Sequence, residues 1–194
     1  MQMSAKERIR KAAIALFADK GFAATTTREI CEGASVTKPV LYYYFKNKEL
    51  LFHSLLMDAS EESMRLLVRA AQQKGTAREK LINVTAASFA LTMCNPKLSM
   101  MFLRMVFPSG EDEPGIDCVQ IGKEKSRLIA GIVADGIRRG EMRGRPTDVA
   151  RALVGIHLIY SMSYVLTGGP KLDRKLARRL VDMLVDNCKN HSRR

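Results

Sequence analysis

The sequence predicts an all-α fold of about nine helices, and three observations support this class. Capping boxes of the form Ser/Thr-x-x-Glu precede apolar runs at Ser4, Thr26 and Thr76. Apolar residues recur at i, i+3, i+4 and i+7 along most of the chain, which is the spacing of one helix face. The alternation of apolar and polar residues that would indicate strands does not extend over a useful length.

Caps and helix breakers divide the first part of the chain into four helices. Ser, Thr and Asn side chains accept the free amide hydrogens at a helix start, whereas Gly ends a helix because it readily adopts positive φ. Proline is tolerated in the first helical turn, which suits Pro39. The expected helices run from Ser4 to Gly21, from Thr26 to a turn near Ser35, from Thr37 to Phe45, and from Asn47 to about Gln73.

The same signals place five more helices after Gly75. Thr76 begins the first of them, and Asn95 with Pro96 begins the second, which ends before Pro108. The acidic stretch 108–115 is expected to be a loop. The last three helices are expected at about 117–139, at 147–167 with Thr147 as the cap, and at about 172–189.

The composition is that of a globular protein with an unusual charge. Of 194 residues, 46% are hydrophobic and 27% are charged, so a sizeable core can form without disulfides. The net charge is +12, which favours nucleic acid or an anionic membrane surface as partner. No run approaches about 18 apolar residues and the N-terminus lacks a signal-peptide core, so we expect a cytoplasmic protein without a membrane span.

Residues suited to catalysis or metal binding form no recognisable constellation. The motifs of nucleotide-binding loops, zinc proteases and serine hydrolases are absent from the sequence. His53 follows Glu49 by four residues, but nothing nearby completes a metal site. We therefore expect no enzyme activity, no metal and no cofactor. The scattered cysteines are expected to be small buried residues: Cys31, Cys94, Cys118 and Cys188.

Residues 25–50 have the pattern of a helix-turn-helix. Two short helices joined by a tight turn lie within a basic three-helix unit, and the second carries three consecutive tyrosines. Leu41, Tyr44 and Phe45 share one helical stripe and are expected to face inward. The remaining face combines lysine, proline, valine and tyrosine, which suits the major groove because these side chains contact phosphates and thymine methyl groups. The predicted DNA-binding residues are Thr26, Thr27, Arg28, Thr37, Lys38, Pro39, Val40, Tyr42, Tyr43, Lys46 and Lys48.

This segment resembles the N-terminal domain of the TetR family of transcriptional regulators. The matching elements are A-T-T at 24–26, R-E-I at 28–30, V-T-K-P at 36–39, L-Y at 41–42, Y-F at 44–45 and N-K-E-L at 47–50. The match is in register from about residue 4 to residue 64. One position departs from the family pattern, because Ser35 occupies the turn where the family has Gly. A serine in a left-handed turn costs about 1 kcal/mol and is expected to leave the motif intact.

The resemblance implies a homodimer with two functional parts. A DNA-binding domain would span 1–48, and a helical ligand-binding and dimerisation domain would span 49–194. The last two helices of each subunit, 147–167 and 172–189, would pair across the dimer, which reads a palindromic or pseudo-palindromic operator. Their apolar stripes agree with this pairing, although the same stripes could be buried within one subunit: Val149, Leu153, Ile156 and Leu180.

The resemblance also implies a small effector in the larger domain. Soft or aromatic side chains on neighbouring helices suggest an apolar or amphipathic ligand with one or two polar groups, although each residue is also suited to an ordinary core. The candidate ligand-binding residues are Phe89, Met93, Met101, Phe102, Met105, His157, Tyr160 and Tyr164.

The favoured function is a dimeric repressor that the effector releases from its operator. A ligand pressing on the long helix near Leu66, Leu67 and Ala70 would tilt this helix. The tilt would change the distance between the DNA-contacting helices of the two subunits. An activator or a ligand-independent regulator is the nearest alternative. A basic membrane-surface or adaptor protein is the alternative from another class, because the C-terminal helix is rich in arginine and lysine.

Overall fold

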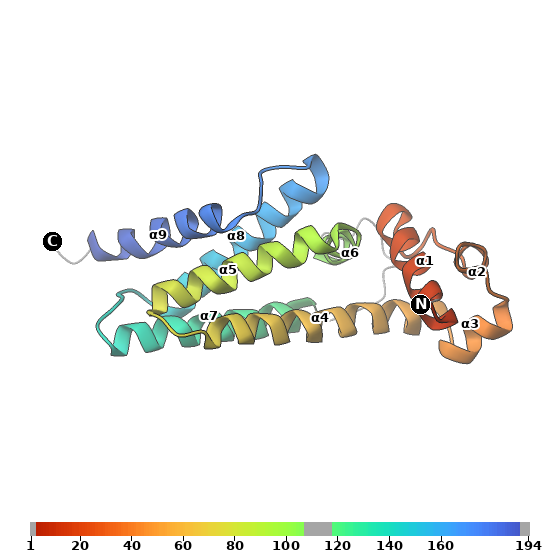
Figure 1. Ribbon diagram of the computed structural model, residues 1–194, viewed down its shortest axis with the longest axis horizontal. Helices are drawn as coiled ribbons and strands as arrows, with labels where there is room; N and C mark the ends of the chain where they lie inside the picture. The colour runs from red at the N-terminus through yellow and green to blue at the C-terminus, as the bar shows by residue number, and fades with distance from the viewer. Residues whose placement is uncertain (1–2, 107–117, 191–194) are drawn as a thin grey trace. The chain divides into compact units, whose positions relative to one another are not determined.

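A computed structural model describes residues 3–106 and 118–190, and within these ranges it contains nine helices and no strand. The predicted all-α fold is confirmed. The helices are α1 (Ala5–Lys20), α2 (Thr27–Ala34), α3 (Lys38–Tyr44), α4 (Lys48–Gln72), α5 (Ala77–Cys94), α6 (Pro96–Val106), α7 (Cys118–Arg138), α8 (Pro146–Thr167) and α9 (Arg174–Asn190) (Figure 1).

The predicted caps are confirmed at the starts of α1, α2 and α5, where Ser4, Thr26 and Thr76 form complete capping boxes. The predicted cap of α8 is wrong. Arg145 is the N-cap residue and Thr147 lies inside the helix, because the fixed φ of Pro146 suits the first helical position. The predicted loop at 108–115 lies outside the described residues.

The last helix also begins later than predicted. It starts at Arg174 rather than near Leu172, because the Asp173 carboxylate accepts a hydrogen bond from the Leu176 backbone N–H at 2.9 Å. Leu172 is instead buried in the core beside the helix. Its burial explains why an apolar pattern alone places the helix start too early.

The chain forms two compact units that do not follow the predicted domain boundary. The first unit contains residues 1–61 and 96–118, and the second contains 62–95 and 119–194. Residue 48, where the predicted DNA-binding domain ends, is the first residue of α4. The division between the compact units falls inside α4, so this helix contributes to both of them.

The first unit includes α6 because this helix packs against α1. Met101 of α6 is buried in the same core as the helix-turn-helix. The Arg104 guanidinium donates hydrogen bonds to the backbone carbonyls of Ala18 and Asp19, at 3.0 Å and 3.2 Å, where α1 ends. These carbonyls have no partner within α1, so Arg104 completes the C-terminus of that helix.

An aromatic cluster forms the centre of the first unit. Phe17 contacts Phe52 edge-on, with ring centroids 5.0 Å apart, and both rings also contact Phe22. Ile9, Ile30 and other aliphatic residues of α1–α4 surround these rings. Short helices with little stability of their own are therefore held by one shared core.

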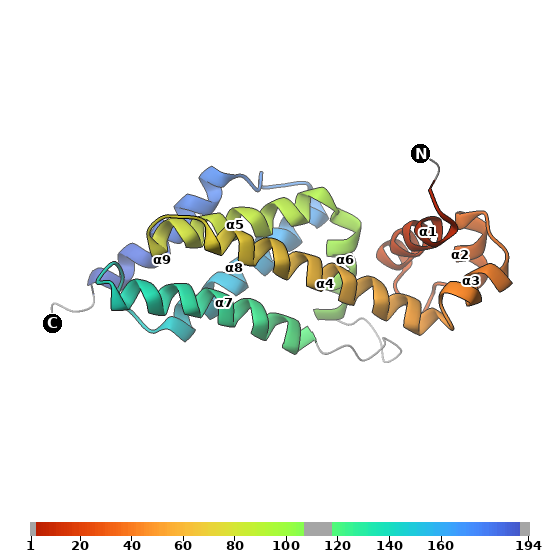
Figure 2. The same ribbon diagram turned by 60° about the horizontal axis from the view of Figure 1, so that its bottom comes forward.

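The second unit is a helical bundle in which α5 packs against α8 and α9 (Figure 2). Its main core joins the C-terminal half of α4 to α5, α7, α8 and α9. Leu67, Leu81, Ile129, Leu153 and Val181 represent these helices in that core, and each is almost fully buried. Burial of such side chains stabilises the bundle by about 1.5–3 kcal/mol for each residue.

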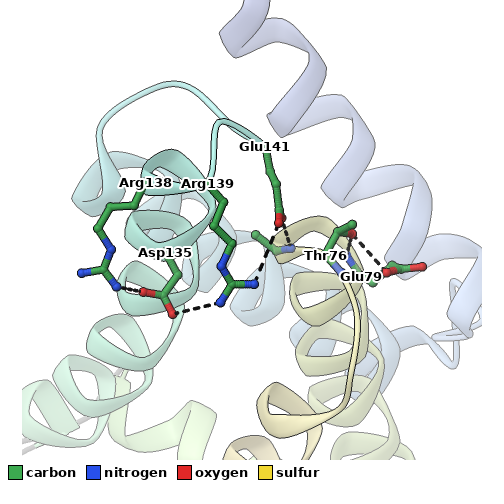
Figure 3. A network of polar contacts seen from close by, with 7 residues as sticks. Thr76, Glu79, Asp135, Arg138, Arg139 and Glu141 are labelled. Atoms are coloured by element: carbon green, nitrogen blue, oxygen red, sulfur yellow. Dashed lines mark hydrogen bonds and ion pairs between the residues drawn. The ribbon is translucent and has the colours of Figure 1, made fainter.

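Polar contacts join the start of α5 to the end of α7 (Figure 3). The Glu141 carboxylate accepts a hydrogen bond from the Ala77 backbone N–H at 2.6 Å, and Arg139 lies 3.9 Å from Glu141 and 4.0 Å from Asp135. Gly136 permits the close approach of the two helices, since a Cβ at this position would lie 2.5 Å from the Cβ of Ala77. A side chain at residue 136 is therefore incompatible with this packing.

By length and apolar composition α8 could cross a membrane, with a mean hydropathy of 1.5 over its most apolar window. Only 22% of that window is buried within the chain. One face of α8 packs inward through Ala150, Leu153 and His157, whereas Ile159 and Leu166 on the opposite face remain 52% and 62% exposed. The helix therefore presents an apolar face that its own chain leaves uncovered.

Candidate DNA-binding surface and effector site

The second helix of the helix-turn-helix is α3, which is anchored by two apolar side chains. Leu41 is fully buried and Phe45 is 7% exposed, as predicted. The prediction that Tyr44 faces inward with them is wrong, because Tyr44 is 39% exposed. Its ring lies against that of Tyr43, with centroids 5.1 Å apart, so it belongs to the aromatic surface of the helix.

The turn before α3 has the left-handed geometry expected for Ser35, with φ 51° and ψ 53°. The Ser35 backbone N–H donates a hydrogen bond to the Glu32 carbonyl, and the Val36 N–H donates one to the Cys31 carbonyl. These bonds satisfy carbonyls that the end of α2 leaves free, which compensates for the conformational cost of a non-glycine residue. The turn therefore holds α3 at a defined angle to α2.

Most of the predicted DNA-binding side chains lie on the surface of the first unit. Tyr43 is the most exposed tyrosine, at 82%. Val40 is partly buried and packs against the helix-turn-helix core, and Arg28 forms an ion pair with Glu32 at 2.8 Å. The exposed or partly exposed members are Thr26, Thr27, Arg28, Thr37, Lys38, Pro39, Tyr42, Tyr43 and Lys46.

Lys48 has a structural role that its sequence position does not reveal. Its ammonium donates hydrogen bonds to the backbone carbonyls of Phe22 and Thr25, at 2.9 Å and 2.8 Å, and lies 4.1 Å from the centre of the Phe22 ring. Partial burial lowers the pKa of Lys48. The residue therefore ties the start of α4 to the α1–α2 loop, and one of its three ammonium protons is left for another acceptor.

The predicted effector residues divide between the two compact units. Phe89, Met93, Tyr160 and Tyr164 meet in one aromatic cluster of the second unit, with His157 in edge contact with Phe89. The other three belong to α6 in the first unit and pack against the helix-turn-helix core: Met101, Phe102 and Met105. The first group remains the candidate effector site.

A polar cluster adjoins these aromatic rings. The Lys125 ammonium donates a hydrogen bond to the Ser88 hydroxyl at 2.7 Å, and His157 Nε2 lies 3.1 Å from the Thr85 hydroxyl. His157 is 2% exposed, and its Nδ1 atom has no hydrogen-bond partner among the described residues. Polar atoms that are buried without partners are rare, because desolvation costs about 1–3 kcal/mol.

The charges in this cluster follow from burial. Burial lowers the pKa of Lys125 to about 8, so the ammonium stays mainly protonated at neutral pH. Burial and the nearby Lys125 charge hold the pKa of His157 well below its usual range, so the imidazole is neutral. The cluster therefore has a single positive charge with an uncharged imidazole beside it.

Sequence reasoning missed the hydroxyl side chains of this cluster. Thr85, Ser88 and Thr92 recur at i, i+3 and i+7 on α5, and Thr92 contacts Ser161 of α8 at 2.8 Å. This spacing on one helix face is a signal that the sequence alone contains. Lys125 gave no signal, because a lysine in a basic helix is usually solvated.

A separate surface pocket of about 330 Å³ lies among α4, α5 and α7. Ala71, Ala77 and Ile132 contribute apolar walls, and Lys80 and Arg127 contribute positive charge. Elsewhere the expectation that cysteines are buried is confirmed for Cys31 and wrong for Cys94, which is exposed. The side chains of Cys118 and Cys188 lie outside the described residues.

The helix-turn-helix region matches a known family. The family model described as "Bacterial regulatory proteins, tetR family" matches residues 9–55, which contain α1, α2, α3 and the start of α4. The fatty acid metabolism regulator protein of Bacillus subtilis is 24% identical over 181 residues, covering 92% of this chain and 93% of that protein. Residues 9–55 therefore form a DNA-binding domain of the tetR type, and the chain is a DNA-binding transcriptional regulator.

Other relatives agree with this assignment over most of their length. The transcriptional repressor KstR2 of Mycolicibacterium smegmatis is 26% identical over 86% of this chain and 82% of its own. A tetR-family protein of Rhodococcus RHA1 has the same fold, with a TM-score of 0.79 at 22% identity over 96% and 98% of the two chains. FadR of Bacillus subtilis, solved in complex with stearoyl-CoA, has a TM-score of 0.77 at 22% identity over 92% and 97%.

Proposed function

We propose that this regulator is a dimeric, cytoplasmic repressor that a small amphipathic effector releases from a palindromic operator. The observation that carries the proposal is the distribution of functional side chains. Exposed lysines and tyrosines surround α3 in one compact unit, and an aromatic and polar cluster lies in the other. The continuous helix α4 contributes to both units.

The exposed face of α3 supports docking in the major groove. Thr37, Lys38 and Pro39 lie at its start, and the Thr37 hydroxyl makes no capping bond and so can contact DNA. Lys38 and Lys46 add positive charge for phosphates, and Tyr43 adds a large exposed ring with a hydroxyl group. The anchored side chains of α3 keep this face outward.

The uncovered face of α8 supports dimerisation. The stripe named from sequence is largely used within the chain, since Val149, Leu153 and Leu180 are buried there. The outward face of α8 lies opposite this buried stripe. Its exposed or partly exposed residues recur at helical spacing: Ala152, Gly155, Ile159, Met162 and Leu166. We propose that a second copy covers this face, and not a lipid bilayer, because Asp148 and Arg151 on the same helix are exposed charges.

Two connections support communication between the cluster and the DNA-binding helices. Leu67 and Ala70, near the end of α4, are buried in the core of the second unit, while Leu51 and Leu55 of the same helix are buried in the first. The helix α6, which directly follows α5, is bonded to α1 through Arg104. A ligand that moves α4 or α5 therefore has a direct route to α1–α3, provided that it binds the two states with different affinity.

Relatives support an effector with a large apolar part. One relative is named for fatty acid metabolism, one similar structure contains stearoyl-CoA, and another is described as a ketosteroid transcriptional regulator, KstR2 of Mycobacterium tuberculosis. Phe89, Met93, Tyr160 and Tyr164 provide a matching apolar surface in this chain. A fatty acyl compound is accordingly the first effector to test.

The proposal is tested by selecting operator DNA from a random duplex library and titrating it with the full chain. Lys38→Ala should weaken the selected site by about 1–3 kcal/mol and relax its preference at one position in each half-site. Lys11→Ala is the control, because Lys11 is an exposed lysine of α1 outside the predicted surface. Equal losses for the two variants, or binding to anionic vesicles but not to DNA, would contradict the proposed docking.

Release is tested by adding stearoyl-CoA to the protein–operator complex. Linkage requires that operator DNA weakens effector binding by the same factor by which the effector weakens DNA binding. Equal effector affinity with and without operator would favour the alternative of a ligand-independent regulator. Tighter operator binding in the presence of the effector would favour an effector-assisted repressor or an activator.

A further inference from the structure

Three positions in the second unit offer an anionic ligand a binding partner: the surface pocket near Arg127, the arginine-rich face of α9, and the polar cluster at Lys125. In the first two, most of the cations are exposed, and on α9 Arg174 already donates a hydrogen bond to Asn83. Only Lys125 combines a desolvated charge with a buried orphan polar atom.

We propose that the effector of this regulator is an amphipathic monocarboxylic acid whose carboxylate binds the Lys125 ammonium between α5, α7 and α8. This inference rests on the proposed effector-controlled function and specifies the class of effector. Ser88 and Thr85 supply hydroxyl groups beside the charge, and His157 supplies a further polar group at the same place.

The protein alone provides too few acceptors for the ammonium protons of Lys125. An ammonium has three protons, and Ser88 accepts one of them among the described residues. Ser88 and Thr85 lie on one face of α5, one turn apart, and the facing side chain of α8 is the neutral His157. The described part of the chain places no carboxylate beside this ammonium, although buried lysines are usually paired with an acidic group.

The charge of the site selects a monoanion. One ammonium beside an uncharged imidazole balances one carboxylate, whereas a phosphate monoester would bring close to two negative charges into the same space. His157 can place a proton on Nδ1, and this N–H could then donate to a carboxylate oxygen that replaces the missing partner. With the proton on Nδ1, the Thr85 hydroxyl donates to Nε2 in place of the Leu81 carbonyl, and the Ser88 hydroxyl is left to donate to the carboxylate.

The adjoining side chains provide a place for the hydrocarbon part. Met93, Ile156, Tyr160 and Tyr164 pack against the cluster around Phe89 and are only partly buried, so their apolar surface is partly accessible. On a helix of 3.6 residues per turn, Tyr160 and Tyr164 lie about a third of a turn or more from the centre of the α8 face that we assign to the dimer. A ligand beside these two tyrosines therefore contacts α5 and α8 without occupying the centre of the dimer surface.

The test uses the full chain and two probes of equal chain length, dodecanoate and dodecanol, both kept below their solubility limits. Dodecanoate should bind at least tenfold more tightly than dodecanol in calorimetric titration, and should release operator DNA at correspondingly lower concentration. Lys125→Met should weaken dodecanoate binding by roughly tenfold to a hundredfold, the value of a charge-assisted hydrogen bond, and should leave dodecanol binding almost unchanged.

Lys123→Met is the matched control, since this exposed lysine lies half a turn away on the same helix and should retain wild-type binding. Equal binding of acid and alcohol, or dodecanoate binding that Arg127→Met abolishes and Lys125→Met does not, would overturn the inference. Stearoyl-CoA release of the operator with no dodecanoate binding would overturn it too, while leaving the repressor function standing. Failure of the wild-type protein to bind any DNA would instead contradict the proposed function.

Discussion

The two compact units place their polar functional groups in opposite ways. In the first unit the interior is aromatic and aliphatic, while lysines, threonines and tyrosines lie outside around α3. In the second unit the interior itself contains a lysine, a histidine and several hydroxyls beside the aromatic cluster. A surface for a large polyanion needs a rigid support, whereas a site for a small molecule needs unsatisfied groups inside.

The largest expected effect is a loss of stability confined to the first unit. Phe17→Ala removes a ring that is 1% exposed and contacts both Phe22 and Phe52, so the free energy of unfolding of this unit should fall by about 3–5 kcal/mol. Hydrogen exchange monitored by mass spectrometry should become faster in α1–α3 and α6. Unchanged protection of α8 and α9 is the internal control, and faster exchange throughout the chain would contradict the division into two units.

A second comparison tests the packing of the second unit with two glycines of α7. Gly136→Ala places a methyl group 2.5 Å from the Ala77 Cβ and 2.8 Å from the Met142 sulfur, and should destabilise the protein by about 1–3 kcal/mol. Gly131→Ala meets no atom within 4 Å and should be neutral or stabilising, by up to about 1 kcal/mol. Chemical denaturation measures the free energy of unfolding of both variants. Equal effects would show that the close packing of Gly136 against Ala77 does not limit stability.

Lys48 contributes to the stability of the first unit, which its position in the DNA-binding motif does not indicate. Lys48→Ala removes two hydrogen bonds to loop carbonyls and should lower the free energy of unfolding by about 1–2 kcal/mol. All DNA sequences should be weakened alike, because the loop before α2 is loosened. Lys46→Ala should leave stability unchanged and reduce the salt dependence of DNA binding by about one unit of slope.

Salt titration of DNA binding separates the two lysines. An unchanged slope for Lys48→Ala assigns it to the loop only. A slope reduced by about one would mean that the remaining ammonium proton also reaches a phosphate. Loss of preference for one sequence over others would contradict both roles.

The smallest effect is a pH dependence of effector binding. The carboxylate needs protonated Lys125, whose pKa is about 8 in the free protein, and the bound carboxylate raises that pKa. Affinity should therefore be nearly full at pH 7 and below, and fall by about tenfold between pH 7 and pH 9. The groups facing Lys125 are His157, which is neutral across this range, and the uncharged hydroxyls of α5. Dodecanol binding is the control and should not change with pH.

The helix-turn-helix could be predicted because its signals are local. Capping boxes at Ser4 and Thr26, and the buried spacing of Leu41 and Phe45, depend on residues a few positions apart. Tyr44 was misplaced because α3 has only seven residues, and its neighbours in space decide which of them are covered. A short helix gives too few turns for periodicity to distinguish a buried position from a half-exposed one.

Features that depend on distant residues could not be predicted. The bonds from Arg104 to the end of α1 join residues 85 and 86 positions apart, so nothing in the sequence near α6 indicated its place in the first unit. The contacts of Lys125 with Ser88 and of His157 with Thr85 likewise join separate helices. His157 could be predicted as a candidate because an imidazole within the apolar stretch of α8 is unusual. Phe89 could be predicted as part of the apolar side of the site.

The insertion of α6 into the first unit has a consequence for biosynthesis. The first 61 residues leave the ribosome before the segment that carries Met101 and Arg104, so the core of this unit stays incomplete until more than thirty residues of the second unit have followed. A nascent chain that stops at residue 61 leaves the carbonyls of Ala18 and Asp19 without Arg104 and part of its apolar core in water. The DNA-binding unit therefore matures late, although it is encoded first.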